Sequence, residues 1–144
     1  MIEQDTIRLL RECDAGIKMG VSAIDEVMDS AQDKALRAML SKCKKEHEEL
    51  SKSLQAALER FHDEGKEPNP MAKTMSTVKT NMELMMHPTD ATIADLITDG
   101  CNMGVKSLSK YLNEYKAADE SAKDVCKKLI ALEEQLAKEL RGYL

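Results

Sequence analysis

One histidine of this 144-residue chain lies among residue types that bind transition metals. His47 shares an apolar helical stripe with Cys43, and imidazole, thiolate and carboxylate groups are the usual ligands of zinc and iron. The sequence therefore allows a single soft-metal site in which Cys43, Cys101 or Glu133 joins His47. The alternative is a buried histidine that hydrogen-bonds one internal acceptor, for which Glu133 is the natural candidate. We expect this second arrangement.

Glu133 is the candidate acceptor because the chain contains the same helical pattern twice. The segment 16–21 returns as 100–105, with the shared form Gly-x-x-Met-Gly-Val, and 48–54 is echoed by 134–140. The offset between copies is nearly the same in both matches, and it relates His47 to Glu133. An internal repeat of this length indicates two related helical hairpins.

The elements that would position these residues are amphipathic helices. Apolar residues recur every three or four positions through most of the chain, as they do on one face of a helix. We expect long helices over 3–31, 33–64, 90–117 and 119–143, and a crossover helix over 70–86. Short connections make each pair of long helices an antiparallel hairpin. The sequence thus predicts an all-α fold, a four-helix bundle of two repeated hairpins with a helical crossover, in one domain over 1–144.

Local signals mark several helix ends. Gly65 can adopt the left-handed conformation that stops a helix, so the second helix should end beside it. Asn69 before Pro70 has the form of an N-cap followed by proline in the first turn. For the last two long helices, caps are expected at Thr89 or Asp90 and at Asp119 or Ser121.

The chain has ten methionines, and they are concentrated in the predicted crossover helix, which holds five of them. Helical spacing places an apolar set on one side of the crossover helix, namely Met75, Val78, Met82, Met85 and Met86. We expect the flexible thioethers to fill an irregular seam against the bundle. An adaptable binding surface is the alternative.

Two Gly-x-x-x-Gly motifs lie inside predicted helices, Gly16/Gly20 and Gly100/Gly104. Each interior glycine costs roughly 0.5–1 kcal/mol relative to alanine, so four of them need a compensating reason. Close packing of the helices over 3–31 and 90–117 would supply it. A contact between subunits through the same faces is the alternative.

Composition limits the possible functions. The net charge of −5 argues against non-specific binding to nucleic acid or to an anionic membrane. No run of about 18 apolar residues and no signal-peptide pattern occurs, so we expect a cytoplasmic protein. The four cysteines, Cys13, Cys43, Cys101 and Cys126, form no C-x-x-C pair, which favours reduced, buried thiols over a zinc site held by all four.

In its predicted architecture the chain resembles the ferritin-like superfamily. More narrowly, it looks like an uncharacterised bacterial branch of that superfamily, known as a four-helix-bundle domain of unknown function. The resemblance covers roughly residues 5–142 and includes Asp14-Ala15-Gly16 in the first helix, its partner Asp99-Gly100, and the helical crossover. The order and spacing of these short motifs carry the resemblance.

The resemblance also implies where metal ligands would lie. Di-iron members take one glutamate from each of two helices and Glu-x-x-His from each of the other two. His47 matches one histidine position, but Lys44 stands where its glutamate belongs. Glu133 falls at the other histidine position, with Ile130 three residues before it. The two remaining ligand positions fall near Cys13 or Asp14 and near Thr98 or Asp99.

We therefore expect a non-catalytic ferritin-like bundle without an intact di-iron site. It would act as an interaction or scaffold protein, as a homodimer, and without a cofactor. The alternative is a metal-binding or redox-sensing protein with an altered site for one zinc or iron ion. Its candidate ligands are His47, Glu133, Asp14, Cys43 and Cys101.

Overall fold

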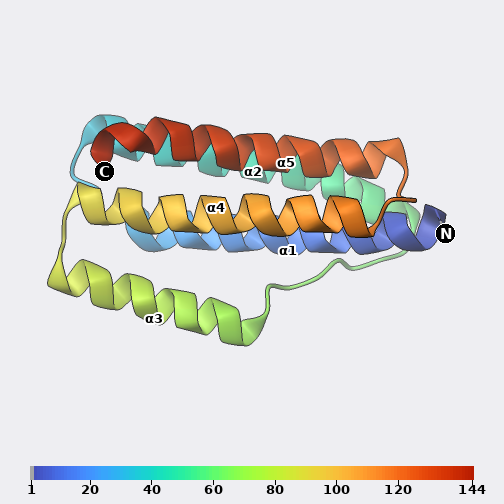
Figure 1. Ribbon diagram of the computed structural model, residues 1–144, viewed down its shortest axis with the longest axis horizontal. Helices are drawn as coiled ribbons and strands as arrows, with labels where there is room; N and C mark the ends of the chain where they lie inside the picture. The colour runs from blue at the N-terminus through green and yellow to red at the C-terminus, as the bar shows by residue number, and fades with distance from the viewer. Residues whose placement is uncertain (1) are drawn as a thin grey trace.

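The computed structural model of the protein describes residues 2–144 and is all-helical over that range, with no strand. Its long helices lie side by side, with one shorter helix outside them (Figure 1). The α-helices are α1 (Ile2–Met28), α2 (Lys34–Arg60), α3 (Pro70–Met86), α4 (Asp90–Glu114) and α5 (Glu120–Leu140), followed by a 3-10 turn, Arg141–Tyr143.

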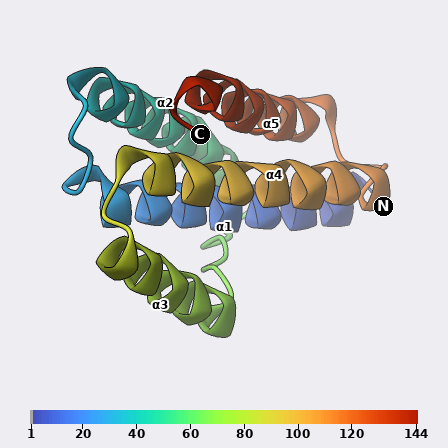
Figure 2. The same cartoon turned by 60° about the vertical axis from the view of Figure 1, so that its left-hand side comes forward.

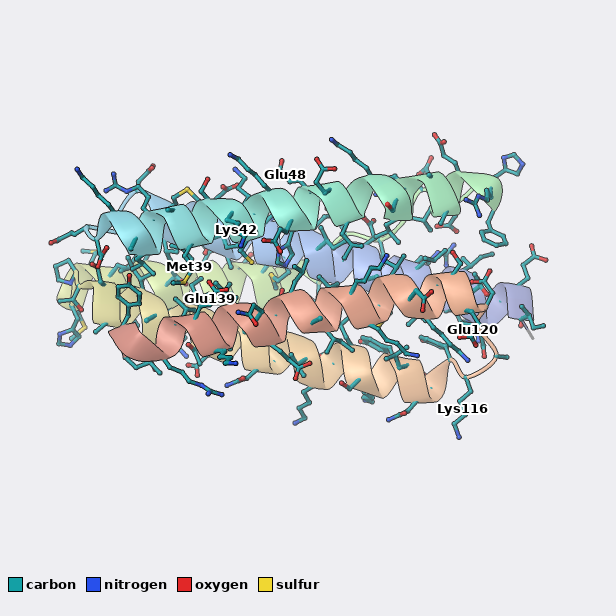
Figure 3. All side chains as sticks on the ribbon, turned by 90° about the horizontal axis from the view of Figure 1, so that it is seen from above. Met39, Lys42, Glu48, Lys116, Glu120 and Glu139 are labelled. Carbon is teal, nitrogen blue, oxygen red and sulfur yellow. The ribbon has the colours of Figure 1, made fainter. Side chains whose placement is uncertain are left out.

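The four long helices form two antiparallel hairpins. α1 packs against α2 and α4 packs against α5, while α1 also contacts α4 and α5, and α2 contacts α5. The crossover helix α3 packs on α1 and α4 only from outside and diverges from them toward its N-terminal end (Figures 1 and 2). Charged side chains such as Lys42, Glu48 and Glu139 cover the outer surfaces of α2 and α5 (Figure 3).

Two apolar clusters fill the interior of the four-helix part. One cluster joins the C-terminal halves of α1 and α5 to the N-terminal halves of α2 and α4, and includes Ile24, Leu36, Leu40, Ile93 and Leu140. The other lies at the opposite end of the bundle and includes Leu9, Leu10, Leu54, Leu58 and Leu129. Aliphatic side chains dominate both clusters, as expected for helices that bury a stripe of period 3.6.

Several helix starts match the sequence signals. The Asn69 side chain accepts hydrogen bonds from the backbone N–H groups of Met71 and Ala72, and Pro70 is the first residue of α3. Thr89 caps α4 and Asp119 caps α5 in the same way. These caps satisfy backbone donors that have no partner within the helix.

The end of α2 differs from the prediction. The helix ends at Arg60 rather than near Gly65, and His62 adopts a φ of 55°. Arg11 of α1 forms an ion pair with Asp63, which draws the chain away from the α2 axis and along α1. Gly65 does take a positive φ, of 86°, but within the linker. The other long helices end about one turn earlier than predicted, where capping turns begin.

The expectation that the methionines of α3 fill a seam is wrong. The outward side of α3 carries six exposed apolar residues, which we call the α3 stripe: Met71, Met75, Val78, Met82, Met85 and Met86. Their exposed fractions range from 51% for Val78 to 85% for Met85. The inward side is largely polar instead. Thr80 is buried there, and the Thr77 hydroxyl donates to Glu26 of α1 at 2.6 Å.

The helices of residues 2–144 include none whose length and apolar content would let it cross a membrane. The longest ones, α1 and α2, carry charged residues on their outer faces throughout.

Candidate functional site

His47 of α2 lies at the centre of the bundle, between the two apolar clusters, and is fully buried. Its Nε2 is 2.8 Å from Oε1 of Glu133 on α5. Its Nδ1 is 2.8 Å from the backbone carbonyl oxygen of Cys43, one turn earlier in α2, so that Nδ1–H donates to this oxygen. The predicted pairing of His47 with Glu133 is therefore confirmed. Both ring nitrogens have partners within the chain.

The surroundings of the ring favour the imidazolium form. Burial alone lowers the pKa of His47. Hydrogen bonds to the Cys43 thiol and to Glu133, together with the negative charge of Glu133, outweigh burial and raise the pKa to about 10. The raised pKa favours a charged His47 beside the Glu133 carboxyl group, which is itself only 8% exposed.

Two glycines make the space for this pair. A Cβ atom added at Gly20 of α1 would lie 3.1 Å from His47 Nε2 and 3.4 Å from Glu133 Oε1. A Cβ atom added at Gly104 of α4 would meet the Glu133 side chain at 3.7 Å. Each long helix therefore contributes one residue to a single level of the core. We call these four residues, Gly20, His47, Gly104 and Glu133, the waist layer.

The waist layer corrects the predicted role of the glycines. The sequence predicts that the glycines let the backbones of α1 and α4 approach each other, but a Cβ atom added at Gly20 or Gly104 would point at side-chain atoms of the ion pair rather than at the backbone of the other helix. Gly16 faces Leu129 and Leu108 at ordinary contact distances, and Gly100 faces open space. The two motifs thus have one member each in the waist layer, and the other members have no comparable constraint.

The candidate soft-metal ligands do not converge on one point. Cys43 and Glu133 contact opposite edges of the His47 ring, with Cys43 Sγ at 3.5 Å from Nδ1, so one ion cannot be bound by all three. Cys101 faces the same region, and burial followed by the charge of Glu133 raises the pKa of its thiol. Raising that pKa disfavours the thiolate form that binds metals. Within residues 2–144 no three His, Cys, Asp or Glu side chains are arranged to hold a metal ion.

Asp14, another candidate ligand, lies in a different place with a different role. Its carboxylate is buried and accepts hydrogen bonds from the Gln55 side chain at 2.9 Å and from the Lys66 backbone N–H at 3.0 Å. Lys18 pairs with it at 3.0 Å. Gln55 lies about 12 Å beyond His47 along α2, since each helical residue adds about 1.5 Å. Asp14 therefore anchors the linker to α1 rather than joining His47.

The other positions implied by the ferritin-like resemblance are also apart from the waist layer. Lys44 forms an ion pair with Asp25 of α1 at 2.7 Å on the surface. Asp99 is 59% exposed and faces Lys79 of α3 at 3.9 Å. Ile130 packs against the apolar cluster at the other end of the bundle. The residues of α1 and α4 that share a level with His47 are the two glycines, and these cannot bind a metal through a side chain.

The four cysteines are free and buried, as the sequence predicts. They are divided between the two apolar clusters, with Cys43 and Cys101 in one and Cys13 and Cys126 in the other. A contact with Cys126, together with burial, raises the pKa of Cys13. A single zinc ion held by all four thiols is therefore incompatible with this packing.

Sequence reasoning missed two features. Gly20 and Gly104 take the same place in their Gly-x-x-Met-Gly-Val motifs, with His47 and Glu133 at a similar offset, and this was a signal that the glycines make space for a buried polar pair. No such signal existed for the exposed side of α3, because a helix with methionines on one side and polar residues on the other is expected to pack its methionines inward.

Comparisons of the chain with family models, with curated proteins and with solved structures found no significant match in any of the three.

Proposed function

We propose that this protein is a ferritin-like bundle without a di-iron centre, and that it acts by binding protein rather than by catalysis. The composition of the waist layer is the observation that carries this proposal. Its α1 and α4 positions are glycines, and both nitrogens of its only imidazole have internal partners. Hard divalent and trivalent cations need several carboxylate oxygens, of which this layer offers those of Glu133 alone.

Two further observations support a role in binding protein. The α3 stripe exposes apolar side chains of a kind that adapts to partners, since methionine is flexible and polarisable. The reduced state of all four cysteines fits the cytoplasm, where thiols are kept reduced. In this proposal the protein is a cytoplasmic homodimer and requires no cofactor.

The test is elemental analysis of protein purified without an affinity tag from cells supplied with iron and zinc. We expect far less than one metal ion per chain. The matched variant is His47→Gln, which keeps a polar side chain of similar reach toward Glu133. Stoichiometric metal in the wild type that is lost in His47→Gln would contradict the proposal and support a metal-binding or redox-sensing protein instead.

A further inference from the structure

The α3 stripe has the spacing of a helix-pairing seam. Successive members Met71, Met75, Val78, Met82 and Met85 are separated by alternating steps of four and three residues, which is the a/d pattern of a coiled coil. The spacing keeps all five on one side of α3 over its whole length. This is the pattern by which one helix packs along another.

The exposed area of the stripe is large for a protein surface that stays free. Five methionines and one valine, each more than half exposed, present on the order of 800 Å² of mostly apolar surface, which is about what one partner contributes to a standard interface. Patches on monomeric proteins are usually smaller. A helix pair that buried most of this area would reach the range of standard interfaces.

The chain's own bundle cannot cover this stripe. The opposite side of α3 is attached to the bundle through Thr77 and Glu26, through the buried Thr80, and through Leu84, which packs on the apolar cluster below. Both ends of α3 are also fixed. The linker before it is held to α1 by Lys18 and Glu67 at 2.8 Å, among other pairs, and the connection to α4 is only a few residues long. Rotation of α3 would break these contacts.

We propose that the partner is a second copy of this chain, with the two α3 stripes packed against each other as an antiparallel pair about a twofold axis near Val78. This inference rests on the proposed function, that the protein acts by binding protein, and names the first partner. The stripe is nearly symmetric about Val78, with methionines at similar distances on both sides, so the same surface can serve both copies. Such self-complementary twofold interfaces are the commonest in soluble oligomers.

The positions beside the stripe carry little charge. Ala72, Thr74 and Asn81, which flank the seam, bring no like charges together in a dimer. The one flanking cation, Lys79, is next to Val78, so its two copies come near each other at the axis, where each faces Asp99 of its own chain at 3.9 Å. A partner of opposite charge is not required, whereas a partner with the same uncharged, adaptable surface fits.

The first test is sedimentation velocity from low to high micromolar concentration. We expect a wild-type dimer, and we expect the variant Met75→Lys/Met82→Lys to raise the dissociation constant by at least about 100-fold, because it places two charges from each chain in the seam. The control is Met103→Lys on α4, which is 70% exposed but lies outside the stripe and should leave the dimer intact. Circular dichroism should show unchanged helicity in both variants, since the altered side chains are exposed.

The second test determines orientation by disulfide formation. In an antiparallel pair, position 78 meets its own copy, whereas position 71 lies at opposite ends of the interface. Val78→Cys should therefore form a covalent dimer on mild oxidation and Met71→Cys should not, and the four native thiols are too buried to interfere. Cross-linking by Met71→Cys, or a dimer that persists in Met75→Lys/Met82→Lys, would overturn the inference.

The failure of this inference can be told apart from failure of the proposed function. A wild-type chain that remains monomeric at every concentration would overturn the self-pairing inference. The same holds if the chain stays monomeric while its stripe binds an unrelated protein or a phospholipid vesicle. If that chain is also free of metal, the non-catalytic bundle stands. A dimer that carries stoichiometric metal would contradict the proposed function and leave the pairing intact.

Discussion

The waist layer and the α3 stripe are opposite departures from the usual distribution of polar and apolar residues. The waist layer places an ion pair, His47 with Glu133, inside the core, while the α3 stripe places a row of methionines in solvent. Both depart from the rule that charges lie outside and apolar groups inside. They differ in their partners: the chain supplies partners for the buried ion pair, whereas the row of methionines remains mostly exposed.

In the waist layer every requirement is met internally. His47 has Glu133 and the Cys43 carbonyl as partners, and Gly20 and Gly104 provide the volume. The α3 stripe has no such internal partner, because the contacts of α3 with the bundle use its other side. The polar groups of the waist layer thus have partners within residues 2–144, whereas the apolar side chains of the α3 stripe are mostly exposed over the same range.

The largest expected effect follows from removing one member of the ion pair. Glu133→Leu should lower the free energy of unfolding by about 3 kcal/mol, because it leaves the buried imidazole without its carboxylate. Urea denaturation followed by circular dichroism would measure this. The double variant His47→Leu/Glu133→Leu should recover at least half of the loss, since no charge remains buried. Equal losses in the single and double variants would show that packing, not charge, dominates the waist layer.

A smaller effect is expected from pH. The pKa of His47 is raised from 6.5 to about 10 in the folded protein, so its stabilising contribution is fully present below pH 6.5 and is lost as pH rises toward about 10. The urea midpoint of the wild type should therefore fall steadily across this range. In His47→Leu/Glu133→Leu the fall should be much weaker. An equally steep fall in the double variant would assign the pH dependence to other groups.

Alanine substitutions at the glycines should change stability differently inside and outside the waist layer. Gly20→Ala should destabilise by about 1–2 kcal/mol, because its Cβ would crowd the His47–Glu133 hydrogen bond. Gly104→Ala should be nearly neutral. Gly100→Ala faces open space and should stabilise by about 0.5–1 kcal/mol through helix propensity. A stabilising Gly20→Ala would contradict the packing described for the waist layer.

The smallest effect should come from the α3 stripe under conditions where the chain is monomeric. Met85→Gln, at the most exposed member, should change the free energy of unfolding by less than about 0.5 kcal/mol at low protein concentration. At high concentration the wild type should gain stability relative to this variant, because association stabilises the folded state. Identical concentration dependence in the two proteins would count against a role for the stripe in binding.

Sequence reasoning worked where one local pattern decides the outcome. The period of apolar residues predicts five helices, and caps such as Asn69 and Asp119 predict where helices begin. The His47–Glu133 pairing follows from the repeat offset, because equivalent positions of two hairpins lie at the same level when the hairpins pack together. All of these depend on neighbours in sequence or on a similar offset between matching motifs.

Sequence reasoning failed for features that depend on contacts between segments far apart in the sequence. The side of α3 that faces the bundle depends on linker contacts such as Arg11 with Asp63, and on the polar acceptor Glu26, which periodicity does not reveal. The predicted role of the glycines was wrong for a related reason, because a small residue indicates that a neighbour lies close but not which neighbour it is. Asp14 was misjudged because a buried carboxylate can serve a backbone N–H as readily as a metal.

The imidazole of His47 is held between the Cys43 carbonyl oxygen and Glu133, so neither ring nitrogen is free to bind a metal. Two-bond proton–nitrogen NMR of the ring measures this directly, with the exposed His62 and His87 as references in the same sample. We expect both nitrogens of His47 to be protonated at pH 8 and the signals to be unchanged after one equivalent of zinc. An unprotonated nitrogen at that pH, or a zinc-dependent shift confined to His47, would contradict the account.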